Sequence, residues 1–377
     1  MKSQNVLEFV RNHAVGVSDC WELPDGSVTF SRLPLYTDDL HLQALFMIDA
    51  TRNTSGVRLE FRTNASKLKL KLAASQLVFP GAPIAKTAID VEVDGTSAVT
   101  HEVAPSEIRT PLSSDSAAAE GAPEIEVATG NAGEWKDVKV WLPHNARTRI
   151  YGIDLDGSVE SAAPKGPKWL HYGSSISQSS EVDSPSQIWP AVAARSLGLH
   201  LRSLGLAGSA LLDPFIADVI LAEKPDVVSL KLGINIVNAA SHNARTFPAA
   251  VNGLLDGIRR SLPNLPILLI TPIHCPPHEE GVGPTIFNAE TFKATASPRP
   301  EEFIPMALNL TMVRQQLGQI FANRSTTDSN LYLMAGPDLF GEADAHLLPD
   351  DLHPNHEGYQ LMAQRFVTAP VVGKWLS

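Results

Sequence analysis

The sequence predicts a two-domain protein of the α/β class. An all-β sandwich of jelly-roll type is expected over residues 1–160, and a three-layer α/β/α domain with a parallel sheet over residues 161–377. Three observations predict this fold. The chain has 377 residues, which is long enough for two domains. Its first part alternates apolar and polar residues, whereas its last part alternates apolar strands with helical patterns.

The N-terminal domain is predicted from runs in which every second residue is apolar. A short helix is expected within residues 1–19, where apolar residues recur at roughly helical spacing. Four later segments alternate apolar and polar residues and are separated by Gly, Pro, Asn and Ser: 57–62, 67–72, 89–95 and 138–142. This pattern is typical of an antiparallel sandwich. Residues 112–133 are rich in Ala, Ser and Gly, so a long surface loop is expected there.

The C-terminal domain is predicted from the regular change between strands and helices. Few large apolar residues occur from Ser158 to Pro167, and we expect the domain boundary there. Strands are then expected at 168–172, 226–232, 267–270 and 331–334, and helices at 187–197, 247–260, 306–321 and 356–367. The strand at 267–270 is apolar throughout, as in a parallel sheet covered on both faces. Active sites of such sheets lie beyond the carboxyl ends of the strands.

Composition excludes several classes of partner. Hydrophobic residues make up 44% of the chain, which is enough for ordinary globular cores. The formal net charge is −11 and there is no basic stretch, which argues against a nucleic-acid partner and against an anionic membrane surface. No run of about 18 apolar residues exists, so no transmembrane helix is expected. The N-terminus lacks the apolar core of a secretory signal, and a cytoplasmic location is therefore expected. Cys20 and Cys275 are the only cysteines and make no disulfide scaffold.

The chain carries the side chains needed for acyl transfer. Asp350 precedes His353 by three residues, so its carboxylate can orient the imidazole from the same loop. Ser175 follows a short apolar run and precedes a helical pattern, which is a suitable place for a nucleophile. Between these segments, the backbone N–H of Gly208 and the side-chain amide of Asn235 can act as oxyanion donors.

Four sequence blocks, taken in order, resemble the SGNH (GDSL-type) hydrolases. In that family Ser, Gly, Asn and His come one from each block, and here the blocks are Gly173–Ile176, Gly208, Gly233–Asn235 and Asp350–His353. The resemblance covers the C-terminal domain. It implies a flavodoxin-like α/β/α fold and an esterase that uses no cofactor and no metal. Ser174 stands where the family commonly has Asp, at a position that varies in the family.

The resemblance implies a role for each site residue. Ser175 is expected to be the nucleophile, His353 the general base and then acid, and Asp350 the orienting carboxylate. The oxyanion hole is expected to consist of the Ser175 backbone N–H, Gly208 and Asn235. The residues alone leave competitors open: Ser174, Ser177 and Ser179 for the nucleophile, Asp351 for the carboxylate, His346 and His356 for the base, and Gly205 for the glycine. Structural roles without catalysis are also open: Ser175 or Asn235 can be a helix N-cap, and Gly208 can be a loop glycine that adopts a positive φ.

Three further features have weaker interpretations. The run from His274 to Glu280 contains metal-ligand residue types, but no second cluster has zinc spacing, so a loop of the substrate pocket is favoured over a metal site. Residues 279–300 are candidates for a lid or an oligomer contact. Trp21, Trp135 and Trp141 are candidates for a sugar-stacking platform, although core packing is the commoner role.

The function predicted from these features is that of a serine esterase that hydrolyses a carboxylic ester through an acyl-Ser175 intermediate. A β-sandwich before an SGNH domain resembles the layout of some carbohydrate acetyl esterases, so a short acyl group on a small molecule or carbohydrate is the first substrate hypothesis. The alternatives are a lipase or thioesterase for longer chains, acyl transfer to an alcohol, and a carbohydrate-binding or scaffold protein with a dormant hydrolase domain. The oligomeric state, including a homo-oligomer, stays open.

Overall fold

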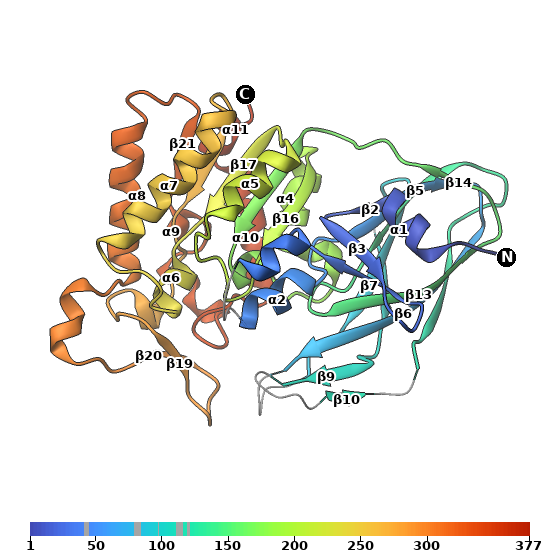
Figure 1. Cartoon of the computed structure of the whole chain (residues 1–377), viewed down its shortest axis with the longest axis horizontal. Helices are drawn as coiled ribbons and strands as arrows, with labels where there is room; N and C mark the ends of the chain where they lie inside the picture. The colour runs from blue at the N-terminus through green and yellow to red at the C-terminus, as the bar shows by residue number, and fades with distance from the viewer. Residues whose placement is uncertain (41–44, 79–83, 97, 111–115, 119–120) are drawn as a thin grey trace. The chain divides into compact units, whose positions relative to one another are not determined.

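The structure is a computed structural model of the chain, drawn in Figure 1. It describes residues 1–40, 45–78, 84–96, 98–110, 116–118 and 121–377. These residues form two compact units. The first unit contains Met1–Lys165 together with Val182–Ile188, and the second contains Gly166–Glu181 together with Trp189–Ser377. Among the described residues, no helix has the length and apolar character needed to cross a membrane.

The first unit consists of two sheets that are antiparallel except for one pair of strands. One sheet has the order β10-β9-β6-β13-β4-β3, with β1 on β13 and β11 on β6, and the other has the order β14-β5-β12-β7-β8, with β2 on β5. Their bounds are β1 Lys2–Ser3, β2 Ala14–Val15, β3 Asp19–Glu22, β4 Val28–Ser31, β5 Arg58–Thr63, β6 Lys67–Leu77, β7 Ala88–Val93, β8 Val99–Glu102, β9 Glu107–Arg109, β10 Ser116–Ala118, β11 Glu124–Ala128, β12 Lys136–Trp141, β13 Arg147–Leu155 and β14 Val159–Ser161. The exception is that β6 and β9 pair in parallel. Two helices, α1 (Val6–His13) and α2 (Leu45–Arg52), complete the unit.

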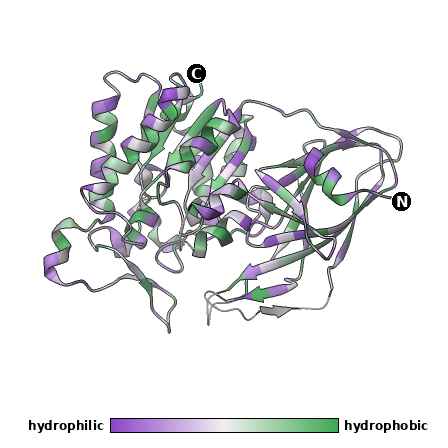
Figure 2. Ribbon diagram, in the orientation of Figure 1, coloured by the Kyte–Doolittle hydropathy of each residue, from purple (hydrophilic) through white to green (hydrophobic). Residues whose placement is uncertain are grey.

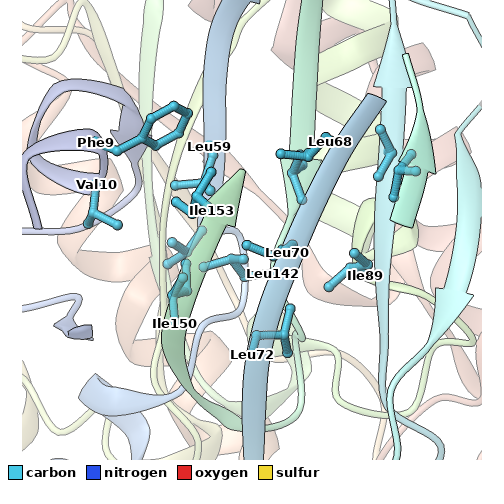
Figure 3. Close-up of a cluster of buried hydrophobic side chains, with 14 of the residues drawn as sticks. Phe9, Val10, Leu59, Leu68, Leu70, Leu72, Ile89, Leu142, Ile150 and Ile153 are labelled. Carbon is cyan, nitrogen blue, oxygen red and sulfur yellow. The ribbon is translucent and has the colours of Figure 1, made fainter. Parts of the chain in front are cut away.

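The alternating pattern of β6 explains why it forms a strand with one buried face. Leu68, Leu70 and Leu72 point into the core and are at most 2% exposed. The lysines between them face outward, where Lys69 pairs with Glu124 of β11 (3.0 Å). Figure 3 shows the three leucines beside Ile150 and Ile153 of β13, together with Phe9 and Val10 of α1. The period-2 prediction is therefore confirmed: one face of each strand supplies the core and the other remains polar.

Two features of the first unit differ from the sequence expectations. The predicted loop 112–133 is wrong in its described part, because β10 and β11 lie within it; residues 111–115 and 119–120 fall outside the described residues. In β11, Ile125 and Val127 alternate with Glu residues, a short pattern that the small residues around it obscured. The second feature is the segment 182–188, which packs with the β-sheets: the Ser186 N–H donates to Asp90 Oδ2 (2.8 Å).

The second unit is a three-layer α/β/α domain, as predicted. Its parallel sheet has the order β16-β15-β17-β18-β21, with β15 Lys168–Gly173, β16 His200–Gly205, β17 Val227–Lys231, β18 Ile267–Ile270 and β21 Leu331–Met334. The helices are α3 Ser175–Gln178, α4 Trp189–Leu197, α5 Phe215–Glu223, α6 Ile234–Asn238, α7 Thr246–Ser261, α8 Leu310–Arg324, α9 Gly336–Leu339, α10 His356–Thr368 and α11 Pro370–Trp375. Counted in chain order within this sheet, the strands run 2-1-3-4-5, which is the flavodoxin-like order.

Apolar faces hold the helices onto the sheet. Trp169 of β15, Trp189 of α4, Phe366 of α10 and Trp375 of α11 form one aromatic cluster, in which Trp169 and Phe366 stack at 5.3 Å between ring centroids. In Figure 2 the helices of this unit carry both hydrophobic and hydrophilic residues, as expected for helices that cover a sheet on one side and face solvent on the other. This packing fixes the strand ends that carry the site.

Candidate active site

A tight turn from β15 into α3 presents Ser175. A Cβ atom on Gly173 would collide with the Ser177 hydroxyl, and one on Gly205 of β16 would collide with the backbone of α3, so both positions require glycine. Ser174 caps α3, with its Oγ accepting a hydrogen bond from the Ile176 N–H (3.3 Å). Ser175 is therefore the first residue of α3, and its backbone N–H has no intrahelical partner. Its side chain remains partly exposed.

The structure brings Ser175, His353 and Asp350 together. The Ser175 Oγ lies 2.9 Å from His353 Nε2, although 178 residues separate them in sequence. On the other side of the ring, His353 Nδ1 lies 2.7 Å from Asp350 Oδ2. The Asp350 Oδ1 accepts hydrogen bonds from the backbone N–H groups of Leu352 (3.0 Å) and His353 (2.6 Å). The carboxylate is therefore fixed by its own loop and imposes the tautomer in which Nδ1 carries the proton.

Electrostatics favour a charged imidazole in this arrangement. Burial lowers the pKa of His353, but the negative charges of Glu181 and Asp350 outweigh that effect and raise the pKa to about 9. Burial also acts to raise the pKa of Asp350, yet its hydrogen bonds from His353 and the positive charge of that ring lower it. The imidazolium form that arises when a serine gives up its proton is thus stabilised.

The two remaining blocks are the loop that carries Gly208 and the first turn of α6, which carries Asn235; the loop is hydrogen-bonded both to α3 and to Asn235. Three neighbouring strands, β16, β15 and β17, are followed by Gly208, Ser175 and Asn235 respectively. The Ala207 N–H donates to Gln178 Oε1 of α3 (3.2 Å), and the Ala210 N–H donates to Asn235 Oδ1 (3.1 Å). Because Oδ1 accepts this hydrogen bond, the Asn235 amide nitrogen points away from Ala210 and can donate to another group. Gly208 is exposed and has φ +66°, which suits glycine.

The arrangement agrees with comparisons to known proteins. The model of the GDSL-like lipase/acylhydrolase family matches residues 171–361, just over half of the chain. The chain belongs to this family. It is accordingly an esterase or acylhydrolase, a carboxylic ester hydrolase, as the sequence blocks predicted. No curated protein sequence matches the chain.

Solved structures resemble this family member over nearly its whole length. A salicylyl-acyltransferase from a tetracycline biosynthetic pathway is 25% identical, with 95% of each chain covered and a TM-score of 0.76. A structure described as a GDSL-like lipase from Bacteroides ovatus is 18% identical, with 97% of this chain and 96% of that chain covered and a TM-score of 0.64. A family two carbohydrate esterase from Cellvibrio japonicus is 11% identical, with 97% of each covered and a TM-score of 0.57. The shared fold therefore includes both units.

The competing serines of this GDSL-like hydrolase have other partners. Ser177 is fully buried, and its Oγ lies 2.8 Å from Nε2 of His171, a histidine on β15. Ser179 is also buried, and its hydroxyl donates to the Ile176 carbonyl (3.2 Å). Ser174 is the helix cap described above. Of the four serines considered in the sequence, only Ser175 lies against His353 among the described contacts.

The competing carboxylate and histidines also lie elsewhere. Asp351 forms an ion pair with Lys293 (3.0 Å). His346 Nδ1 contacts the Ala343 carbonyl (3.0 Å), and His356 begins α10. Lys293 belongs to the 279–300 segment, which contains the hairpin β19 (Thr285–Phe287) and β20 (Ala294–Ala296). Figure 1 shows this hairpin extending away from the parallel sheet.

Several side chains between residues 274 and 280 form hydrogen bonds or ion pairs with other residues of the protein. Glu279 pairs with Arg314 of α8 (2.6 Å) and lies 3.4 Å from His274 Nδ1. His278 Nε2 lies 2.7 Å from the Thr285 hydroxyl of the hairpin. Cys275 is fully buried, and its Sγ contacts the carbonyl of Leu352, the residue before His353 (3.7 Å). The 274–280 loop thus contacts the His353 loop through Cys275. Burial raises the pKa of the Cys275 thiol to about 12.

The three tryptophans of the first unit each have an arginine over the ring. Arg52 lies over Trp21, Arg58 over Trp141 and Arg62 over Trp135, at 4.9, 5.0 and 5.6 Å from the ring centroids. Trp141 is also only 5% exposed and donates its indole N–H to Glu92 (3.0 Å). Core packing accounts for Trp141, whereas Trp135 is 40% exposed and Trp21 is half-buried, so the sugar-stacking role stays a prediction.

Sequence reasoning missed two residues, Glu181 and Tyr359, that link the segment after α3 to α10. Glu181 lies six residues after Ser175, and its Oε2 accepts a hydrogen bond from the hydroxyl of Tyr359 on α10 (2.8 Å). Neither belongs to a family block, and an isolated Glu after a helix carries no signal. Only the folded chain shows that this carboxylate acts on His353.

Proposed function

We propose that this GDSL-like hydrolase is a serine esterase that cleaves a short acyl ester through an acyl-Ser175 intermediate. The observation that supports it best is the position of His353, with Nε2 2.9 Å from Ser175 Oγ and Nδ1 2.7 Å from Asp350 Oδ2. A serine hydroxyl is a weak nucleophile until a base within hydrogen-bond reach removes its proton. Nucleophile, base and orienting carboxylate have the distances this step requires.

In the acylation step, Ser175 Oγ attacks the ester carbonyl carbon while its proton passes to His353 Nε2. The carbonyl electron pair moves to oxygen, which becomes an oxyanion. The Ser175 and Gly208 backbone N–H groups and the Asn235 amide are the proposed donors to it. When the tetrahedral intermediate collapses, the carbon–oxygen bond to the alcohol breaks, and the proton on Nε2 passes to the leaving alkoxide. Asp350 keeps Nδ1 protonated throughout and balances the transient imidazolium charge.

The deacylation step repeats this sequence with a second nucleophile. Water attacking the acyl-Ser175 carbonyl gives a free acid, whereas an alcohol attacking it gives a new ester. Both routes use the same base and the same oxyanion donors, so these residues serve either outcome. The 25% identity over 95% of the chain to a salicylyl-acyltransferase favours transfer to an alcohol as a second candidate function.

A small ester is the proposed substrate. A pocket of about 390 Å³ lies beside α6, the helix that carries Asn235, and is lined by Ile236, His242 and Arg299 among others. Ser175, Gly208, Asn235 and His353 are not among the residues that line this pocket, so its volume does not define the size of the substrate. The carbohydrate esterases with this fold are under 25% identical, so a carbohydrate alcohol rests on the shared two-unit layout alone.

A p-nitrophenyl ester series from acetate to palmitate tests the proposal on the wild type and on Ser175→Ala. The expected result is the highest kcat/KM on acetate and no turnover in the variant. Rates that rise toward palmitate would instead assign a lipase or thioesterase. Full activity of Ser175→Ala would contradict the acyl-serine route. Absence of turnover on every ester would favour a scaffold with a dormant hydrolase domain.

The same assay separates hydrolysis from acyl transfer. Adding a sugar or aromatic alcohol during p-nitrophenyl acetate turnover gives a competing acceptor for acyl-Ser175. If transfer is the function, product analysis will show the acetylated alcohol at the expense of free acetate. If hydrolysis is the function, acetate remains the product at every alcohol concentration.

A further inference from the structure

The loop after β16, which carries the proposed oxyanion donor Gly208, is held at almost every backbone N–H group. From Leu206 to Leu212, six of the seven N–H groups donate to an acceptor among the described residues. The pairs are Leu206 with the Gly173 carbonyl (2.7 Å), Ala207 with Gln178 Oε1 (3.2 Å), Ser209 with the Leu206 carbonyl (3.1 Å), Ala210 with Asn235 Oδ1 (3.1 Å), Leu211 with the Ser209 carbonyl (3.0 Å) and Leu212 with the Tyr172 hydroxyl oxygen (3.3 Å). The exception is the exposed Gly208, whose N–H has no acceptor in the described part of the chain and can therefore donate to a ligand.

Three of these acceptors are side chains, and two of them have no role so far. One of the three is the proposed oxyanion donor on α6, and the other two are Gln178 of α3 and Tyr172 of β15. Their places along the loop differ. The partner of Gln178 is Ala207, which directly precedes Gly208, whereas the partner of Tyr172 is Leu212, four residues beyond Gly208. The peptide plane that carries the Gly208 N–H therefore directly follows the plane that Gln178 holds.

The Gln178 amide is itself fixed in orientation. The side chain is only 4% exposed, and its Nε2 donates to the Ser180 hydroxyl (3.0 Å) while its Oε1 accepts the Ala207 N–H. Because a backbone N–H can donate only to the amide oxygen, these two contacts determine which way the amide faces. Gln178 is also the last residue of α3, the four-residue helix that begins at Ser175. One short element thus carries the nucleophile and holds the loop of the oxyanion donor.

We propose that Gln178 is a positioning residue for the proposed esterase reaction: by accepting the Ala207 N–H, it fixes the direction of the Gly208 N–H. In the proposed function, on which this role depends, Gly208 donates to the oxyanion that forms at the ester carbonyl. Gln178 acts through the loop and not on the substrate. A donor fixed in advance stabilises the transition state without a cost of reorganisation. Loss of this contact should therefore lower kcat and leave KM nearly unchanged.

The test compares Gln178→Met with the full-length wild type in the hydrolysis of p-nitrophenyl acetate. Methionine has a similar length but cannot accept the Ala207 N–H. We expect kcat to fall by about tenfold, less than for outright loss of an oxyanion donor, with KM within about twofold of the wild type. Affinity for phenylboronic acid, which forms a tetrahedral adduct with the Ser175 oxygen, should fall by the same factor as kcat. A lower kcat with unchanged boronate affinity would overturn the proposal.

Two matched controls separate this contact from general loosening of the segment. Ser180→Ala removes the other hydrogen bond of the same amide, and Tyr172→Phe removes an acceptor from the far end of the same loop. Each can lower the melting temperature, but kcat should stay within about threefold of the wild type, because the Ala207 N–H keeps its acceptor. A loss of kcat in either control as large as that of Gln178→Met would contradict a specific role for Gln178.

Amide hydrogen exchange reports the contact without turnover. Exchange at Ala207 should be faster in Gln178→Met than in the wild type, whereas exchange at Ala210, which Asn235 holds, should not change. Unchanged exchange at Ala207 would refute the hydrogen bond, and faster exchange with an unchanged kcat would refute its role in the reaction. The proposed function fails on a different result, activity retained by Ser175→Ala, so the two failures can be told apart.

Discussion

Two serines of α3, two residues apart in this GDSL-like hydrolase, each lie against a histidine, and the two serine–histidine pairs share a contact distance but differ in burial and charge. Ser175 and His353 are 2.9 Å apart, and Ser177 and His171 are 2.8 Å apart. The His353 side chain is 17% exposed and has Asp350 behind it. His171 is fully buried, and its second nitrogen faces the hydroxyl of Ser229, not a carboxylate (2.7 Å).

The difference teaches that hydrogen-bond reach alone does not make a nucleophile. Two carboxylates raise the pKa of His353 to about 9, whereas burial and the neighbouring Lys231 lower that of His171 to about 3. His171 cannot hold a proton taken from Ser177, because a bare charge in an apolar interior is strongly disfavoured. The buried Ser177–His171 pair therefore only satisfies hydrogen bonds between β15, α3 and β17. The partly exposed Ser175–His353 pair has the carboxylates that stabilise a proton on its histidine.

The largest effect expected from this comparison is on the two serines. Ser175→Ala should lower kcat/KM for p-nitrophenyl acetate by at least about 10³-fold with an unchanged melting temperature. Ser177→Ala should do the opposite: activity stays within about tenfold, but stability falls by about 1–2 kcal/mol because His171 Nε2 loses its buried partner. Enzyme kinetics and thermal unfolding of both variants check this. A dead but fully stable Ser177→Ala protein would reverse the assignment.

The second comparison concerns Asn235, the proposed side-chain donor to the oxyanion that forms at the Ser175–His353 pair. Asn235→Ala should lower kcat by about 10²–10³-fold, since one donor to the oxyanion is lost. Asn235 Oδ1 also accepts the Ala210 N–H, so the loss of that bond needs a control. Asn235→Asp keeps the acceptor and removes the donor. Equal losses in kcat identify the donor as the cause, whereas an active Asn235→Asp enzyme would argue that only the loop contact matters.

The pH dependence of activity should follow His353 alone. Since its pKa is about 9, kcat/KM should rise by about tenfold per pH unit from neutral pH until that value is approached. His171 stays neutral over this range because its pKa is about 3. A stopped-assay pH profile with p-nitrophenyl acetate, corrected for spontaneous hydrolysis, gives the limb. An acid limb near pH 6.5 would mean that the two carboxylates do not act on the ring as the structure indicates.

The same two histidines should affect stability with opposite signs. The raised pKa of His353 gives a stabilisation that is complete below about pH 6.5 and lost as the pH rises through about 9. The lowered pKa of His171 disfavours the folded state increasingly as the pH falls below about 6.5, because only the unfolded chain takes up that proton. Urea unfolding of His353→Ala and His171→Asn at pH 5, 7 and 9 separates the two slopes. Identical slopes in both variants would contradict the comparison.

The smallest effect is expected at Ser174. Its hydroxyl only caps α3, so Ser174→Ala should keep most activity and lose about 1 kcal/mol of stability. Retained turnover together with a lower melting temperature is the expected result. Loss of turnover comparable to that of Ser175→Ala would show that the reading frame of the nucleophile block is shifted by one residue.

Much of the fold could be predicted because local patterns encode it. Alternating leucines and lysines in β6 predict a half-buried strand, and the apolar run of β18 predicts a strand covered on both faces. The pattern failed at two strands: β16 holds a buried arginine, Arg202, and the alternation in β11 is obscured by the small residues around it. The four site blocks could be recognised because the proposed nucleophile and oxyanion donors follow the ends of three neighbouring strands, and the proposed orienting carboxylate, Asp350, precedes His353 by three residues.

By itself, the sequence determined the two fold classes, the strand ends that carry the site and the residue types available there. The tertiary structure decided which serine meets which histidine. Ser175 and Ser177 are two residues apart and chemically identical, but α3 turns one toward the His353 loop and the other toward β15. It also joined Tyr359, on the helix that follows the His353 loop, to Glu181, on the segment that follows α3. Both outcomes depend on contacts across about 180 residues of chain, and a pKa depends on the charges gathered around a group rather than on its neighbours in sequence.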